Sequence, residues 1–89
     1  MYNNIFNICR VCGLRYDNYY PWGVDGKSPS FDYCDCCGTE FGYQDCNIDA
    51  IRAKRKTWID GGAKWESPEA QPINWSLGES LKQIPEIYK

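Results

Sequence analysis

The sequence has 89 residues, among them six cysteines and no histidine, and its formal net charge is −2. A chain of this length buries too little surface for a hydrophobic core alone to hold it firmly, so we expect a metal ion or disulfides to stabilise one domain. The absence of histidine excludes a Ser-His-Asp triad, a Cys-His couple and any metal site with imidazole ligands.

The chain begins with residues 1–10, which lack both the basic leader and the apolar run of a secretory signal. No stretch approaches the roughly 20 apolar residues that span a bilayer. We therefore expect a cytoplasmic protein that does not associate with membranes. Because disulfides seldom persist in a reducing cytosol, this expectation favours metal binding by the cysteines.

Two Cys-x-x-Cys-Gly sequences, at 9–13 and 34–38, form the most specific pattern in the chain. Two thiolates three positions apart on a tight turn can both reach one ion at about 2.3 Å, and the following glycine permits the positive φ that the turn needs. Two such turns that face each other complete a tetrahedral site of four sulfurs. The expected metal ligands are Cys9, Cys12, Cys34 and Cys37.

Zinc and iron both accept four thiolates, and we expect zinc, with iron as the alternative. Three disulfides are a second interpretation of the six cysteines, which the missing export signal disfavours. A thioredoxin-like redox pair at Cys9 and Cys12 is a third. It would require the pair to begin a helix, whereas residues 14–17 have an extended and turn-like composition.

Cys36 and Cys46 are left over as spare thiols. If Cys36 replaced Cys34, the ligands Cys36 and Cys37 would be adjacent and would strain a small tetrahedral site. We expect two free, partly buried thiols and favour this over a bridge between Cys36 and Cys46 or a redox role.

Between the two cysteine sequences, residues 17–30 are rich in turn-forming residues and in aromatic rings, which predicts an ordered loop. The apolar period then becomes helical from Ile48. Asn47 or Asp45 is available as the N-cap and glycines 61–62 as the stop, so we predict a helix of about 13 residues. It is expected to lie on the cysteine-bearing half.

A second, shorter helix is predicted after Ser76, because residues 76–79 form a capping-box pattern and Pro85 ends the segment. A helix this short is stable only when its apolar residues dock on the rest of the protein.

Charge divides the chain into two parts. The first 50 residues carry three basic and seven acidic residues, a net charge of −4, whereas the remainder has a net charge of +2. An acidic cysteine-rich half repels phosphate and suits a basic protein partner, so nucleic-acid binding is disfavoured. The basic run at 52–56 is expected to be a solvated helix face rather than a phosphate site. The expected partner-binding residues are Trp22, Asp32, Asp35, Glu40, Tyr43, Asp45 and Asp49.

Residues 9–45 resemble the rubredoxin and zinc-ribbon group, through Cys-x-x-Cys-Gly-x-x-Tyr-Asp at 9–17 and Cys-x-x-Cys-Gly at 34–38. In rubredoxins the four cysteines hold one iron for electron transfer. The chain departs from that pattern at residues 35–36, where a proline is usual, and residues 46–89 have no rubredoxin counterpart.

A broader resemblance, carried by residues 21–30, 34–45 and 58–65, is to small bacterial cysteine-rich proteins of the CPCC type. Some of these are associated with bacterial toxin systems as immunity proteins. The resemblance implies a bacterial source and a protein-binding role, and it assigns no catalytic residue.

These observations predict an α+β fold of one domain, residues 1–89. A zinc-ribbon or rubredoxin-like double knuckle with short antiparallel hairpins occupies 1–45, and a Trp-rich extension with one packed helix and a short C-terminal helix occupies 46–89. The expected function is a non-catalytic protein-binding module with a structural four-cysteine zinc site, such as an immunity or antitoxin-type inhibitor of a basic toxin. The alternatives are a rubredoxin-like iron electron carrier and a nucleic-acid-binding zinc ribbon. The oligomeric state is left open.

Overall fold

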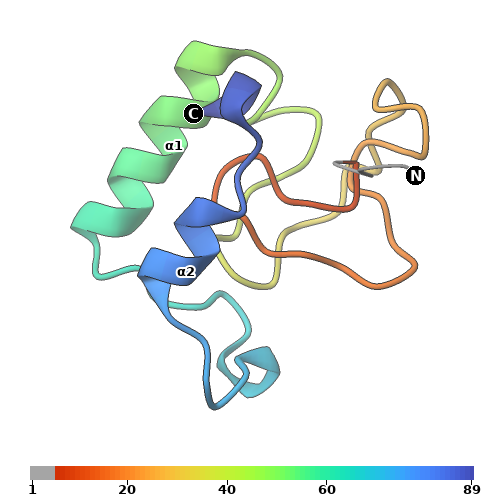
Figure 1. Ribbon diagram of the computed structural model, residues 1–89. Coiled ribbons are helices and arrows are strands. Elements are labelled where there is room, and N and C mark those ends of the chain that lie inside the picture. The colour runs from red at the N-terminus through yellow and green to blue at the C-terminus, as the bar shows by residue number, and fades with distance from the viewer. Residues whose placement is uncertain (1–5) are drawn as a thin grey trace.

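The computed structural model describes residues 6–89; the leader prediction rests partly on residues 1–5, which lie outside them. The described residues contain four helical elements: α1 (Ile48–Asp60), the 3-10 helix η1 (Pro68–Ala70), α2 (Leu77–Lys82) and the 3-10 helix η2 (Glu86–Tyr88). Figure 1 shows the two α-helices on one side of the molecule and the long loops of the first half on the other. Within residues 6–89, neither α-helix has the length and apolar run that crossing a bilayer takes.

The predicted α+β fold with antiparallel hairpins is wrong. Residues 6–89 contain no β-strand, and antiparallel pairing is limited to two isolated bridges, Ile8 with Arg15 and Tyr33 with Glu40. The first turn cannot grow into a ladder because the chain leaves it for residues 17–30. That segment includes positive φ values at Asn18, Gly23 and Gly26, which bend the backbone away from the extended form that a ladder requires.

Helix α1 forms where the sequence predicts it. The side-chain oxygen of Asn47 accepts from the N–H of Ala50 at 2.8 Å, and this N-cap fixes the first residue of the helix. Gly61 is the C-cap, as predicted. The helix buries Ile51 and Trp58 against the cysteine-bearing half, so its predicted position is also confirmed.

Helix α2 is likewise confirmed, with Ser76 as its N-cap. The Ser76 hydroxyl accepts from the N–H of Glu79 at 3.3 Å. Trp75, which precedes the cap, stacks edge-on against Trp65 at 5.6 Å between ring centroids and against Trp58 at 6.3 Å. This aromatic cluster secures a helix of six residues that would not be stable by itself.

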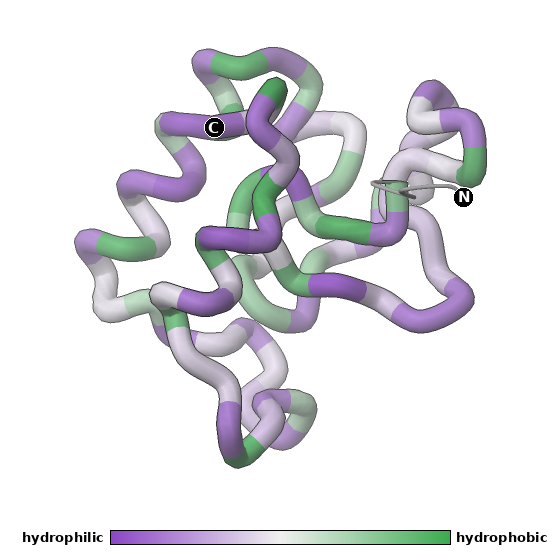
Figure 2. Tube along the Cα trace, in the orientation of Figure 1, coloured by the Kyte–Doolittle hydropathy of each residue, from purple (hydrophilic) through white to green (hydrophobic). Residues whose placement is uncertain are grey.

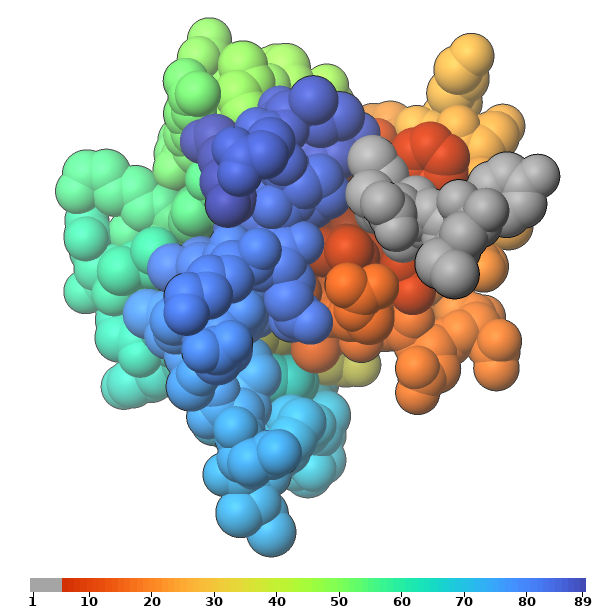
Figure 3. Space-filling view, viewed as in Figure 1, coloured from red at the N-terminus to blue at the C-terminus, as the bar shows by residue number. Residues whose placement is uncertain are grey.

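The core is built around the cysteines. Five of the six are buried, together with Val11, Phe41 and Ile51. In Figure 2 the green, hydrophobic stretches gather where the first cysteine-bearing loop passes behind the C-terminal segment, whereas purple residues dominate α1. Figure 3 shows the blue C-terminal segment lying across this face, between α1 and the red N-terminal residues. The C-terminal segment therefore covers the cysteine-bearing half.

Candidate metal centre

Two loops with the same backbone form the candidate site: the first cysteine loop, residues 7–16, and the second cysteine loop, residues 32–41. In each loop the glycine N–H donates to the carbonyl of the first cysteine, at 3.0 Å and 2.9 Å respectively. The N–H of that cysteine donates to the carbonyl five residues later, at 2.9 Å in both loops. The two isolated bridges close the loops at matching positions, so every one of these features recurs 25 residues further along the chain.

The glycine after each cysteine pair takes the left-handed conformation that the sequence predicts, with φ of +84° at Gly13 and +74° at Gly38. A side chain at φ in this range meets its own backbone, which costs about 1–2 kcal/mol. Both glycines therefore allow the chain to turn back after its second sulfur.

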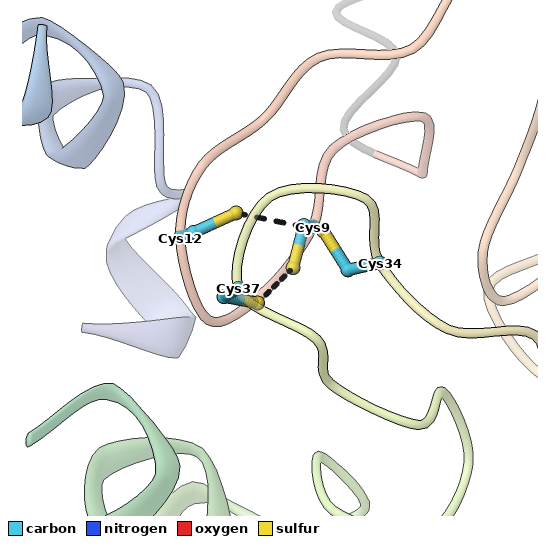
Figure 4. Close-up of side chains that lie close together, drawn as sticks. All are labelled: Cys9, Cys12, Cys34 and Cys37. Atoms are coloured by element: carbon cyan, nitrogen blue, oxygen red, sulfur yellow. Dashed lines mark hydrogen bonds between the residues drawn. The ribbon is translucent and has the colours of Figure 1, made fainter. Parts of the chain in front are cut away.

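The two loops bring four sulfurs together (Figure 4). The Sγ atoms of Cys9, Cys12, Cys34 and Cys37 all lie within 4.8 Å of one another. Across the loops, Cys9 Sγ lies 3.7 Å from Cys37 Sγ, and Cys12 Sγ lies 3.7 Å from Cys34 Sγ.

These separations test what the cluster can hold. A disulfide requires about 2.05 Å between sulfurs, and all six cysteines are free thiols, so neither the three-disulfide interpretation nor a bridge between Cys36 and Cys46 holds. A tetrahedral ion at about 2.3 Å from each sulfur sets neighbouring sulfurs about 3.8 Å apart. The observed 3.7 Å matches that spacing. The four cysteines could hold a metal ion.

Two hydroxyl groups lie beside the sulfurs of the second cysteine loop. Tyr16 donates its hydroxyl to Cys34 Sγ at 3.3 Å, and the Thr39 hydroxyl lies 2.9 Å from Cys37 Sγ. Burial, followed by the charge on Cys34, raises the pKa of Tyr16, so its hydroxyl stays protonated and remains a donor. Such contacts orient thiolates and moderate their charge.

Burial opposes negative charge on two of the thiols. It raises the pKa of Cys9 and of Cys12. The pKa of Cys34 is lowered, because the Cys12 thiol and then its other sulfur neighbours donate hydrogen bonds to it. A bound cation would compensate the charges of four thiolates.

The first cysteine loop is covered by the helices. Ser80 of α2 donates its hydroxyl to the carbonyl of Cys12 at 2.7 Å, and Gln83, the C-cap of α2, donates to the carbonyl of Gly13 at 3.0 Å. The second cysteine loop is covered by residues 66–67, whose N–H groups donate to the carbonyls of Cys36 at 3.0 Å and Asp35 at 2.9 Å.

Arg55 is a residue of the site that the sequence did not single out. The basic run at 52–56 was expected to be solvated, yet the Arg55 guanidinium donates to the carbonyls of Val11 at 2.7 Å, Arg10 at 2.9 Å and Tyr88 at 2.6 Å. Burial lowers the pKa of Arg55, and the negative charge of the nearby cysteines opposes this lowering. Arg55 therefore ties α1 and the C-terminal segment to the first cysteine loop.

The spare thiols differ in their environment. Cys36 is fully buried beside the second cysteine loop's ligands but is not part of the four-sulfur group. Cys46 is exposed just before α1. Neither forms a disulfide.

The structure separates the predicted partner-binding residues into two sets. Asp45 is fully buried and does not lie on the surface: it accepts from the Trp22 indole N–H at 2.8 Å and from the N–H of Gly42 at 2.7 Å. Trp22 is half-buried beneath the Arg10 guanidinium, 4.0 Å from its ring centroid. The other predicted residues retain exposed surface: Asp32, Asp35, Glu40, Tyr43 and Asp49.

Comparison with known proteins identifies relatives that match most of the chain. No protein-family model and no solved structure matches it. The uncharacterized protein YozI of Bacillus subtilis strain 168 is 35% identical to it, over 83% of this chain and 74% of YozI. The uncharacterized protein YoaQ of the same strain is 30% identical, over 83% of this chain and 75% of YoaQ.

Proposed function

The chain belongs to the family of YozI and YoaQ, and we propose that it is a non-catalytic protein-binding module whose fold a structural zinc ion stabilises. The proposed ligands are Cys9, Cys12, Cys34 and Cys37. The observation that supports this most directly is the pair of 3.7 Å separations between sulfurs of different loops.

A closed site favours a structural ion over a catalytic one, because catalytic zinc keeps a position open for water or substrate. Three of the four cysteines are 0% exposed and Cys37 is 4% exposed, and thiolates would occupy all four positions of a tetrahedral ion. When bound, zinc would neutralise the thiolates and link the two loops. Tyr16 and Thr39 would hold the sulfurs in position.

Metal analysis and a visible spectrum of the purified protein test the proposed ion. One zinc per chain and a colourless solution are expected, and the Cys46→Ser variant should retain the same zinc content because Cys46 lies outside the cluster. A red solution with one iron per chain would instead support a rubredoxin-like electron carrier. Full native structure after exhaustive chelation would contradict a structural role for the ion.

The proposed partner is a basic protein. The first 50 residues carry a net charge of −4, and Asp32, Asp35 and Asp49 are exposed there. Large apolar side chains are exposed in the same half, since Phe31 is 59% and Tyr43 is 70% accessible. Aromatic anchors among carboxylates suit a basic surface. The resemblance to toxin-associated cysteine-rich proteins makes a basic toxin the specific candidate.

Affinity capture from the source bacterium tests this partner class. We expect a protein with a basic surface whose association weakens as salt increases, because exposed charges are screened. Recovery of only acidic or nucleic-acid partners would contradict the proposal.

A further inference from the structure

A groove of about 430 Å³ opens beside the second cysteine loop, and its composition is unusual for this molecule. Every residue that lines it is either a tyrosine or an aspartate: Tyr16, Tyr19, Asp32, Tyr33 and Asp35. The groove thus combines aromatic rings with two negative charges and has no positive charge in its lining.

The two carboxylates are available to a ligand. Within residues 6–89, neither Asp32 nor Asp35 takes part in an ion pair. Asp32 accepts from the Tyr19 hydroxyl at 2.9 Å, which orients its carboxylate and leaves the second oxygen available. Asp35 accepts from Ser67 only at 3.4 Å. Both side chains belong to exposed residues, and Tyr33 beside them is 62% accessible.

The chemistry of this lining fits a guanidinium group. A planar cation stacks on an aromatic ring while its N–H groups donate to a carboxylate, and arginine does both better than lysine. The protein already uses the stacking part of this arrangement internally, because the Arg10 guanidinium lies 4.0 Å from the ring centroid of Trp22 and 4.4 Å from that of Tyr88.

The groove adjoins the four-sulfur group. Tyr16, which lines the groove, donates its hydroxyl to Cys34 Sγ at 3.3 Å, and Cys34 lies in sequence between Tyr33 and Asp35, which also line it. An ion that fixes Cys34 would therefore hold these lining residues in place.

We propose that this groove receives an arginine side chain of the basic partner, between the tyrosine rings and the carboxylates of Asp32 and Asp35. The inference rests on the proposed function and deepens it, because it assigns one place and one side chain to the recognition of that partner.

NMR titration of the zinc-loaded protein with the peptide acetyl-Gly-Arg-Gly-amide tests the inference at low salt. Shift changes should gather on the groove residues. Asp35→Asn and Tyr33→Ala should each raise the dissociation constant at least about threefold, as expected for a partly exposed charge or stacking contact. The control variant Glu69→Gln removes an exposed carboxylate outside the groove and should change the dissociation constant by less than about 1.5-fold. The lysine peptide should bind more weakly.

Each other outcome has a definite meaning. Equal weakening by Asp35→Asn and Glu69→Gln would overturn the groove while leaving a diffuse acidic attraction to a basic partner in place. Equal affinity for the arginine and lysine peptides would overturn guanidinium recognition. If no shifts appear at peptide concentrations on the order of 10 mM, the groove is overturned, and the zinc content of the same sample then decides separately whether the proposed scaffold stands.

Discussion

The first and second cysteine loops share one backbone and differ in what surrounds them. The first lies beneath α2 and the Arg55 guanidinium, which donate to four of its carbonyl groups. The second receives two backbone N–H groups from residues 66–67 and opens on its outer side into the tyrosine-aspartate groove. Two equivalent half-sites thus acquire different tasks from their neighbours: the first anchors the helices, and the second presents a surface.

The largest expected effect concerns what the loops share. If both supply half of one metal site, Cys9→Ser and Cys34→Ser should be equally damaging. Structural zinc contributes about 10–16 kcal/mol in zinc-finger peptides, which exceeds the stability of most small domains. Each variant should lose zinc and native structure, as measured by metal analysis and circular dichroism. Cys46→Ser is the control, and a folded Cys34→Ser variant beside an unfolded Cys9→Ser variant would refute the equivalence.

The stability of the zinc-loaded protein should fall as pH decreases. Protons compete with zinc for the four thiolates that both loops would supply, so acid releases the ion and the stabilisation that it provides. Thermal unfolding of the zinc-loaded protein across pH 5–8 measures this slope, and a stability that rises as pH decreases would contradict the prediction.

Alanine at the two glycines should separate the loops most sharply. A Cβ at Gly13 would lie 1.9 Å from the backbone oxygen of Ser80, which cannot move without displacing α2. A Cβ at Gly38 would lie 2.8 Å from Oε1 of Glu66, the far end of a flexible side chain. Alanine at either position also adopts a strained left-handed backbone conformation. We therefore expect Gly13→Ala to lower the free energy of unfolding by about 3–5 kcal/mol and Gly38→Ala by about 1–2 kcal/mol.

Urea unfolding of the zinc-loaded variants measures this difference. An equal loss of unfolding free energy in the two variants would show that the segments covering the two loops are equally rigid. That result would contradict the distinction between a first loop that anchors the helices and a second loop that forms an accessible surface.

A smaller effect is expected where α1 meets the first loop. Arg55→Lys keeps the charge but loses the directed donors that reach the carbonyls of Arg10 and Val11, which should cost about 1–3 kcal/mol. Arg52→Lys is the matched control, because Arg52 donates only from an exposed position to the carbonyl of Lys89. The same urea experiment compares them, and an equal loss in both variants would contradict the anchoring role of Arg55.

The features that the sequence predicts well are those encoded within a few residues. The N-cap of α1 joins Asn47 to Ala50, and that of α2 joins Ser76 to Glu79. The left-handed glycines follow from Cys-x-x-Cys-Gly in the same way. Local chemistry decides these features, so they could be read without knowledge of the rest of the fold.

The features that the sequence does not predict depend on distant partners. Arg55 reaches Val11 across 44 positions, and nothing in a basic run marks one member as buried. Asp45 resembles any acidic surface residue until the Trp22 indole, 23 positions away, supplies its donor. Burial raises the pKa of Asp45 despite that hydrogen bond, which a solvated carboxylate would not show. The hairpin prediction was wrong because the hydrogen bonds of each cysteine loop close within that loop, and the chain then leaves it without extending a ladder.

The sequence separation of these contacts has a consequence for biosynthesis. Cys9 and Cys37 are 28 positions apart, whereas Ser80 and Gln83 reach the first loop across 68 and 70 positions. At ribosomal speeds of about 5–20 residues per second, the four thiols are made about 2–9 seconds before Gln83. Until α2 is made, the first cysteine loop lacks its cover, so the proposed ion would reach the four thiols more freely then than after α2 has docked.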